Sequence, residues 1–122
     1  MPKTFHELCD EVKVNVSECS VADVMDMIKN KEDFIMIDIR EESEFKKGNI
    51  VNSVHLGKGI LERDIHLLAD SHDKKLVLYC GGGYRSILSA DNLRKMGYTN
   101  VHSMIGGWKG WNASGGEING EF

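Results

Sequence analysis

The sequence lacks any long apolar run. No stretch approaches the roughly 20 consecutive apolar residues that a helix needs to span a bilayer. The first residues, Met1–Glu7, also lack the uninterrupted apolar segment of a secretory signal peptide. We therefore predict no contact with membranes and a cytoplasmic location.

An excess of positive charge is also missing. The 15 lysines and arginines are outnumbered by 19 aspartates and glutamates, so the formal net charge is −4 at pH 7. A chain of this sign has no bulk attraction to nucleic acid or to an anionic membrane surface. We predict no nucleic-acid partner, and any anionic ligand must be held by a local site.

Patterns typical of metal sites are absent as well. The three cysteines are an odd number without metal-ligand spacing, and a reducing compartment would keep them as thiols. The five histidines show no spacing that converges on a metal or on a cysteine, and only His55, just before Lys58, lies near a candidate site. We predict neither a disulfide framework nor a metal. The residues concerned are Cys9, Cys19, Cys80, His6, His55, His66, His72 and His102.

What the sequence does contain is an alternation of short apolar runs and amphipathic stretches. Its 122 residues suit one compact domain over 1–122, with a core at about 14–118. Residues 34–39 and 76–80 are nearly continuous apolar runs, as expected for strands covered on both faces. The pattern predicts an α/β fold whose central, mainly parallel sheet is flanked by helices on both faces.

The remaining elements are predicted from capping and periodicity. Ser20 and Asp23 form a capping box that opens a helix, and the acidic cluster Glu41, Glu42 and Glu44 is expected on a solvated helix face. The predicted helices span 21–28, 41–47 (closed by Gly48), 60–69 and 86–96 (closed by Gly97), and further strands are predicted at 51–56 and 101–105. A turn is expected to pack Trp108 and Trp111 onto the sheet, and a loose tail is expected at 115–120.

The candidate chemistry lies where residues 76–80 end. Cys80 stands at the carboxyl end of a predicted parallel strand, the edge where open α/β sheets bind ligands. The glycines at 81–83 allow a tight curl whose N–H groups point inward, and the helix starting near Arg85 or Ser86 adds its positive dipole end. This environment stabilises a thiolate, so Cys80 is predicted to be a nucleophile and not merely a small buried apolar residue.

Two other interpretations of this loop are weaker. The segment Gly81–Ser86 superficially resembles a dinucleotide-binding fingerprint, but the acidic residue expected about 20 positions later is missing. A phosphate-cleaving cysteine loop is the second alternative, and it needs a cradle large enough for a phosphoryl group.

Three segments together resemble the single-domain rhodanese-like sulfurtransferases, over nearly the whole chain. Asp38–Glu41 with the following Gly48–Ile50 is similar to the family's D-x-R and G-H-I segments. Residues Cys80–Ser86 are similar to its C-x-x-G-x-R-S loop, and Gly106–Trp111 to its G-G-x-x-x-W ending. Four residues separate cysteine from arginine, namely Gly81, Gly82, Gly83 and Tyr84. In this superfamily four implies sulfur transfer, whereas five implies phosphatase or arsenate reductase chemistry.

The resemblance also implies roles for individual residues. Cys80 would carry a persulfide, cradled by the backbone N–H groups of residues 81–86, and Arg85 would close the loop. Lys58 lies where some members carry the arginine of R-G-x-x-E, so it is the candidate for binding an anionic donor, without the bidentate geometry of arginine. Asp38 and Arg40 are expected to give structural support. The missing proline and histidine of G-H-I-P-G-A affect only a connecting turn.

The implied function is transfer of sulfane sulfur from thiosulfate or a similar small anionic donor to a thiol, cyanide or protein-cysteine acceptor. No cofactor is expected beyond the covalent persulfide on Cys80. One alternative is a non-enzymatic sulfur carrier or sensor for a protein partner, because the glycine-only front of the loop leaves room for a bulky acceptor. Phosphatase or arsenate reductase chemistry is the less favoured alternative. Nothing in the sequence places Cys9 or Cys19 near Cys80.

Overall fold

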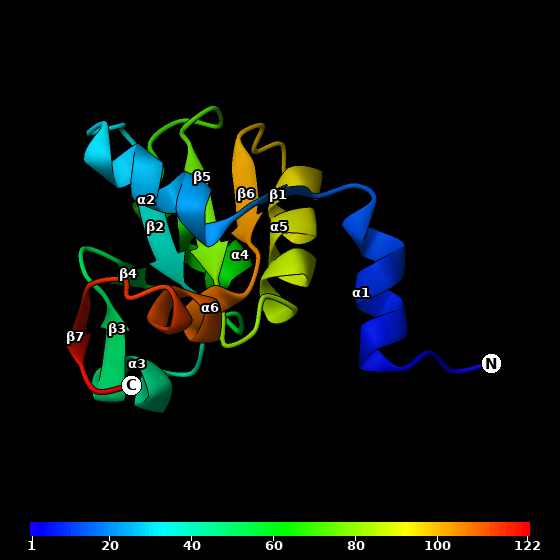
Figure 1. Ribbon diagram of the computed structural model, residues 1–122. Coiled ribbons are helices and arrows are strands. Elements are labelled where there is room, and N and C mark those ends of the chain that lie inside the picture. Colours follow the sequence, from blue (N-terminus) through cyan, green and yellow to red (C-terminus); the bar gives the residue numbers. More distant parts are fainter.

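The computed structural model describes residues 1–122 and shows a five-stranded sheet in the order β1-β6-β5-β2-β4 (Figure 1). Every neighbouring pair in this sheet is parallel. The strands are β1 (Ser17–Cys19), β2 (Ile35–Asp38), β4 (Val54–His55), β5 (Leu76–Tyr79) and β6 (Val101–Met104). The predicted α/β class with a central parallel sheet is confirmed.

Two apolar clusters cover the two faces of this sheet, because successive residues of a strand point to opposite sides. In and just after β5, Leu76, Leu78 and Cys80 belong to one cluster, whereas Val77 and Tyr79 belong to the other. The first cluster packs against α4 (Leu61–Asp64) and α5 (Arg85–Lys95), and the second against α2 (Val21–Lys29) and α6 (Gly107–Ala113). Helices therefore lie on both faces, as predicted.

Most predicted helices form near their predicted bounds. The Ser20–Asp23 capping box is present at the start of α2. Helix α5 ends at Lys95 with Met96 as its C-cap, and the next residue, Gly97, has a φ of +97°, the left-handed conformation that favours glycine after a helix. The helix predicted at 60–69 is shorter, consisting of α4 and a 3₁₀ turn at Ile65–Leu67, and α3 spans Glu42–Lys47.

Residues 48–56 and the C-terminal tail differ from the prediction. The tail predicted as loose forms β7 (Ile118–Gly120), which pairs antiparallel with β3 (Gly48–Ile50). The strand predicted at 51–56 is reduced to β4, because residues 51–52 make a turn. Gly48 does not close α3 in a left-handed conformation: its φ is −174°, and a side chain there would meet the backbone of Glu121. These pairings are non-local, so periodicity could not reveal them.

Helix α1 (Phe5–Lys13) lies outside the predicted core range of 14–118, yet it packs against α5, which lies between α1 and the sheet (Figure 1). Its Cys9 is only 1% exposed. The longest helix, α5, has 11 residues, and no helix combines the length and the apolar character needed to cross a membrane. The packed structure thus begins about ten residues before the predicted core.

Candidate active site

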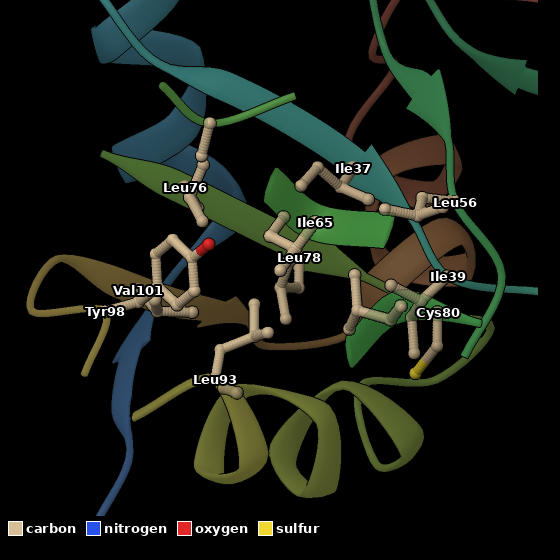
Figure 2. Packing of buried hydrophobic residues seen from close by; sticks show 13 residues of the cluster. Ile37, Ile39, Leu56, Ile65, Leu76, Leu78, Cys80, Leu93, Tyr98 and Val101 are labelled. Atoms are coloured by element: carbon tan, nitrogen blue, oxygen red, sulfur yellow. The ribbon is translucent and has the colours of Figure 1, made fainter. Parts of the chain in front are cut away.

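Cys80 directly follows β5, the central strand of the sheet, and faces the first apolar cluster at the start of α5 (Figure 2). The residue is 1% exposed. Its sulfur accepts a hydrogen bond from the N–H of Gly83 at 3.2 Å and lies 3.6 Å from the hydroxyl of Ser86. Both contacts come from the loop predicted to surround it.

The peptide groups of the loop have a consistent orientation. The carbonyls of Cys80 and Gly81 accept hydrogen bonds from the N–H groups of Trp108 (2.7 Å) and Lys109 (3.0 Å) at the start of α6. The loop N–H groups of Gly81, Gly82 and Tyr84 donate to no protein acceptor. Since the carbonyls are held by α6 and these N–H groups remain available, the loop can cradle an anion next to the sulfur.

Gly83 is the loop glycine whose conformation requires the absence of a side chain. Its φ is +94°, and a Cβ atom there would lie 2.9 Å from the backbone nitrogen of Gly106. Gly107, with φ of +52°, meets the same loop from the other side, because a Cβ there would collide with the carbonyl of Cys80. Two glycines of the predicted G-G-x-x-x-W ending thus pack directly against the cysteine loop.

Gly83→Ala is therefore expected to lower the free energy of unfolding by about 2 to 3 kcal/mol, because alanine is strained at this φ and displaces Gly106. The measurement is urea denaturation of both proteins. Gly82→Ala is the matched control: its Cβ would meet nothing closer than the Tyr84 ring at 3.8 Å, so its stability should stay within about 0.5 kcal/mol of wild type. Equal losses in the two variants would contradict this assignment.

Arg85 is held by an acidic partner that the sequence did not indicate. Its Nη1 donates to Oε1 of Glu44 at 3.3 Å, and its Nη2 lies over Gly81. Burial raises the pKa of Glu44, but the N–H of Glu41 and the Arg85 guanidinium lower it by more, so the carboxylate is favoured. The prediction that Glu44 lies on a solvated helix face is wrong, because this half-buried side chain braces the loop.

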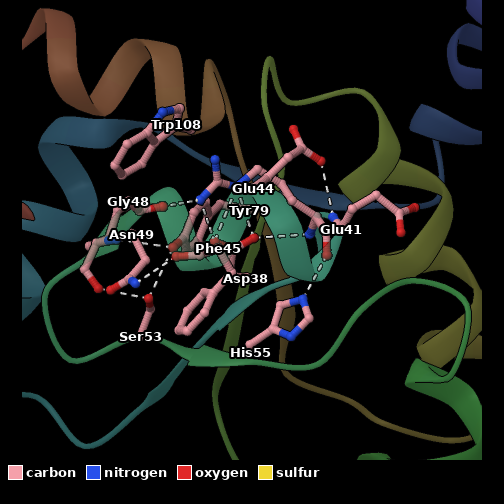
Figure 3. Close-up of polar contacts among 12 residues, drawn as sticks. Asp38, Glu41, Glu44, Phe45, Gly48, Asn49, Ser53, His55, Tyr79 and Trp108 are labelled. Carbon is pink, nitrogen blue, oxygen red and sulfur yellow. Dashed lines mark hydrogen bonds and ion pairs between the residues drawn. The ribbon is translucent and has the colours of Figure 1, made fainter. Parts of the chain in front are cut away.

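Asp38 and Arg40 pair with each other at the end of β2. Arg40 donates to both carboxylate oxygens of Asp38, with a shortest distance of 2.7 Å, and also to the carbonyl of Gly48 at 2.7 Å. Its guanidinium lies 4.6 Å from the centre of the Trp108 ring. Figure 3 shows Asp38, Gly48 and Trp108 around this buried network. These contacts fit the structural support predicted for the pair.

Lys58 lies in the turn after β4, where its backbone N–H donates to the carbonyl of Ile39 at 3.0 Å. Its ammonium group makes no ion pair. The neighbouring histidine, His55, is instead bound through Nε2 to the carbonyl of Arg40 at 2.7 Å and packs against Phe45 (Figure 3). Lys58 thus remains the candidate for contact with an anionic donor, whereas His55 is part of the support.

The N-terminal helix brings two unpredicted residues to the loop. The Cys9 thiol donates to the carbonyl of Tyr84 at 3.6 Å, and the His6 ring lies edge-on to the Tyr84 ring with centroids 4.7 Å apart. Burial raises the pKa of Cys9, the neighbouring charges of Asp10 and Cys80 raise it further, and Lys58 lowers it. Both residues thus contact the Cys80–Ser86 loop through Tyr84, a placement that nothing in the sequence indicated.

Comparison with known proteins agrees with this geometry. The family model described as "Rhodanese-like domain" matches residues 20–114. Thiosulfate sulfurtransferase GlpE of Coxiella burnetii is 31% identical over 83 residues, which are 68% of this chain and 76% of that protein. A mitochondrial protein of Schizosaccharomyces pombe, provisionally named a thiosulfate sulfurtransferase, is 34% identical over 88 residues, or 63% of this chain. The aligned part spans only 62% of that yeast protein.

A solved structure resembles the chain over almost its entire length. RPA3614 from Rhodopseudomonas palustris is described as a protein of unknown function considered for tyrosine phosphatase activity. It has a TM-score of 0.81 and 30% sequence identity, and the match covers 98% of this chain and 99% of that one. The N-terminal helix α1, which precedes the part matched by the family model, therefore falls within this structural match.

Proposed function

Because this chain belongs to the rhodanese-like domain family, we propose that it is a sulfurtransferase that carries sulfane sulfur as a persulfide on Cys80. The observation that carries the proposal is the surroundings of the Cys80 sulfur. One backbone N–H donates to it, and three further loop N–H groups have no protein acceptor. Such a site stabilises an anionic sulfur without a neighbouring general base.

The reaction consists of two displacements. The Cys80 thiolate attacks the outer sulfur of thiosulfate, the sulfur–sulfur bond of the donor breaks, and sulfite leaves with the bonding electron pair. An acceptor thiolate or cyanide then attacks the outer sulfur of the persulfide, and Cys80 leaves as a thiolate. Neither step needs an external oxidant or reductant, and the order of events predicts ping-pong kinetics.

The protein contributes binding and charge stabilisation to both steps. Negative charge appears on the Cys80 sulfur when it is a nucleophile and again when it is the leaving group, so the Gly83 N–H acts each time. The Lys58 ammonium is available for the anionic donor, since no carboxylate neutralises it. Arg85 adds positive charge to the loop, although Glu44 offsets part of it.

Phosphatase chemistry is the competing enzymatic function, in view of how RPA3614 is described. The gap of four residues between Cys80 and Arg85 favours sulfur, because the resemblance associates a wider loop with phosphoryl groups. A sulfur carrier for one protein partner is the non-enzymatic alternative. It would form the same persulfide but turn over small acceptors negligibly.

The test is mass spectrometry of the folded protein after treatment with thiosulfate. We expect a gain of one sulfur atom on the peptide containing Cys80, which disappears when glutathione or cyanide is added. Absence of that gain in folded protein would refute the proposal. A parallel assay with an aryl phosphate distinguishes the phosphatase alternative, which predicts Cys80-dependent release of phosphate and no added sulfur.

A further inference from the structure

Ser103 lies behind the candidate nucleophile in a position that neither the sequence motifs nor the proposed reaction explains. It belongs to β6 and is fully buried, on the same face of the sheet as Val101 and the first apolar cluster. Its hydroxyl lies 2.7 Å from the hydroxyl of Ser86, which is also fully buried. Ser86 in turn lies 3.6 Å from the Cys80 sulfur.

The three side chains therefore form a buried row from β6 through α5 to the end of β5. Ser86 has no side-chain hydrogen-bond partner other than these two residues, and Ser103 has none other than Ser86. A buried hydroxyl costs free energy unless it is hydrogen-bonded, so the two serines satisfy each other. What remains open in the row is the direction of its hydrogen bonds.

The charge on the sulfur fixes that direction. A hydroxyl has one proton to donate, and an anionic sulfur can only accept. When Cys80 is a thiolate, Ser86 must donate its proton to the sulfur, and its oxygen can then only accept the proton of Ser103. Both hydroxyls then donate toward the sulfur: Ser103 donates to Ser86, and Ser86 donates to Cys80.

We propose that Ser103 is a positioning residue that orients the Ser86 hydroxyl toward the Cys80 sulfur and thereby stabilises its anionic form. Without Ser103 the Ser86 hydroxyl could rotate away from the sulfur. Hydrogen bonds in series polarise one another, and their effect is larger in a buried, low-dielectric site. The proposal deepens the proposed function, because the same stabilisation acts on Cys80 as nucleophile and as leaving group.

The experiment measures the rate of Cys80 alkylation by iodoacetamide as a function of pH, followed on the Cys80 peptide by mass spectrometry. For Ser103→Ala we expect the midpoint of the profile to rise by about 0.5 to 1 pH unit. Well below the midpoint, alkylation should be about three- to tenfold slower. This readout requires no sulfur transfer, so the inference can fail independently of the proposed reaction.

Ser89→Ala is the matched control. Ser89 lies one turn further along α5, is fully buried, and its hydroxyl has no hydrogen-bond partner. Like Ser103→Ala, this substitution removes one fully buried serine hydroxyl, but from α5 and outside the hydrogen-bonded row, so its alkylation midpoint should equal that of wild type. The charged and titratable groups around Cys80, namely Arg85 with Glu44, Lys58 and Cys9, are unchanged in all variants.

A double-substitution cycle tests whether Ser103 acts through Ser86. Ser103→Ala should shift the midpoint in the wild-type background but not in a Ser86→Ala background, since the intervening hydroxyl is then absent. An equal shift in both backgrounds, an unchanged midpoint, or the same shift in Ser89→Ala would overturn the inference. If Ser103→Ala does not fold, Ser103→Cys replaces the hydroxyl by a similar-sized, weaker donor and should shift the midpoint in the same direction.

Discussion

Replacing Cys80 by serine is expected to abolish sulfur transfer, with a loss of activity of at least about a thousandfold. The hydroxyl of serine is far less acidic than a thiol, and no general base contacts this position to activate it. The fold should persist because the substitution exchanges one buried atom. The measurement is the rate of thiocyanate formation from thiosulfate and cyanide, together with the thermal midpoint of each protein.

Cys19→Ala is the matched control for the Cys80 substitution. Cys19 is buried at the end of β1, and burial, with the nearby charge of Asp23, raises its pKa to about 11. Its thiol therefore stays neutral near pH 7 and cannot be the nucleophile. We expect this variant to keep its activity. Comparable losses in Cys19→Ala and Cys80→Ser would show that activity reports on stability and not on the Cys80 thiol.

Replacing Arg40 by methionine is expected to have the largest effect on stability, about 3 to 5 kcal/mol. The substitution leaves the carboxylate of Asp38 fully buried without its partner, and it also removes the donor to the Gly48 carbonyl. Burial lowers the pKa of Arg40, but the hydrogen bonds and charge of Asp38 raise it by more, so the arginine stays charged. Urea denaturation measures the loss.

Two further variants test whether the loss comes from leaving the buried Asp38 carboxylate unpaired. Arg40→Lys keeps the charge but loses the bidentate geometry and the stacking on Trp108, so its loss should be smaller than that of methionine. Arg63→Met breaks a pair with Asp64 that has a similar N–O distance of 2.8 Å but an exposed arginine. Its stability should change little, since solvent screens such pairs. Equal losses in the buried and exposed pairs would contradict the argument.

The substitutions described above differ in whether they fall inside the part of the chain that the family model matches, residues 20–114. The match begins at residue 20, so α1 and its contacts with Tyr84 lie outside it. The Asp38–Arg40 pair and the Cys80 loop lie inside it. Substitutions at the loop and the buried pair therefore test features of the matched region, whereas the contacts of Cys9 and His6 come from α1, which precedes that region.

The sequence by itself determined the α/β class, the main strands at β2 and β5, and the candidate nucleophile. These features depend on short-range relations: continuous apolar runs, caps three residues apart, and a cysteine followed at once by glycines and a helix start. The number of residues between Cys80 and Arg85 can likewise be read from this short stretch of sequence. Each of these patterns is complete within about ten residues, so a linear reading is enough.

Only the tertiary structure decided which distant groups complete the site. Glu44 braces Arg85 from 41 residues away, Ser103 meets Ser86 from 17, and Cys9 reaches Tyr84 from 75. The pairing of β3 with β7 likewise joins segments about seventy residues apart. Such contacts arise where the parallel strands end at one edge of the sheet and helices pack across it, and no periodicity along the chain encodes which side chains meet there.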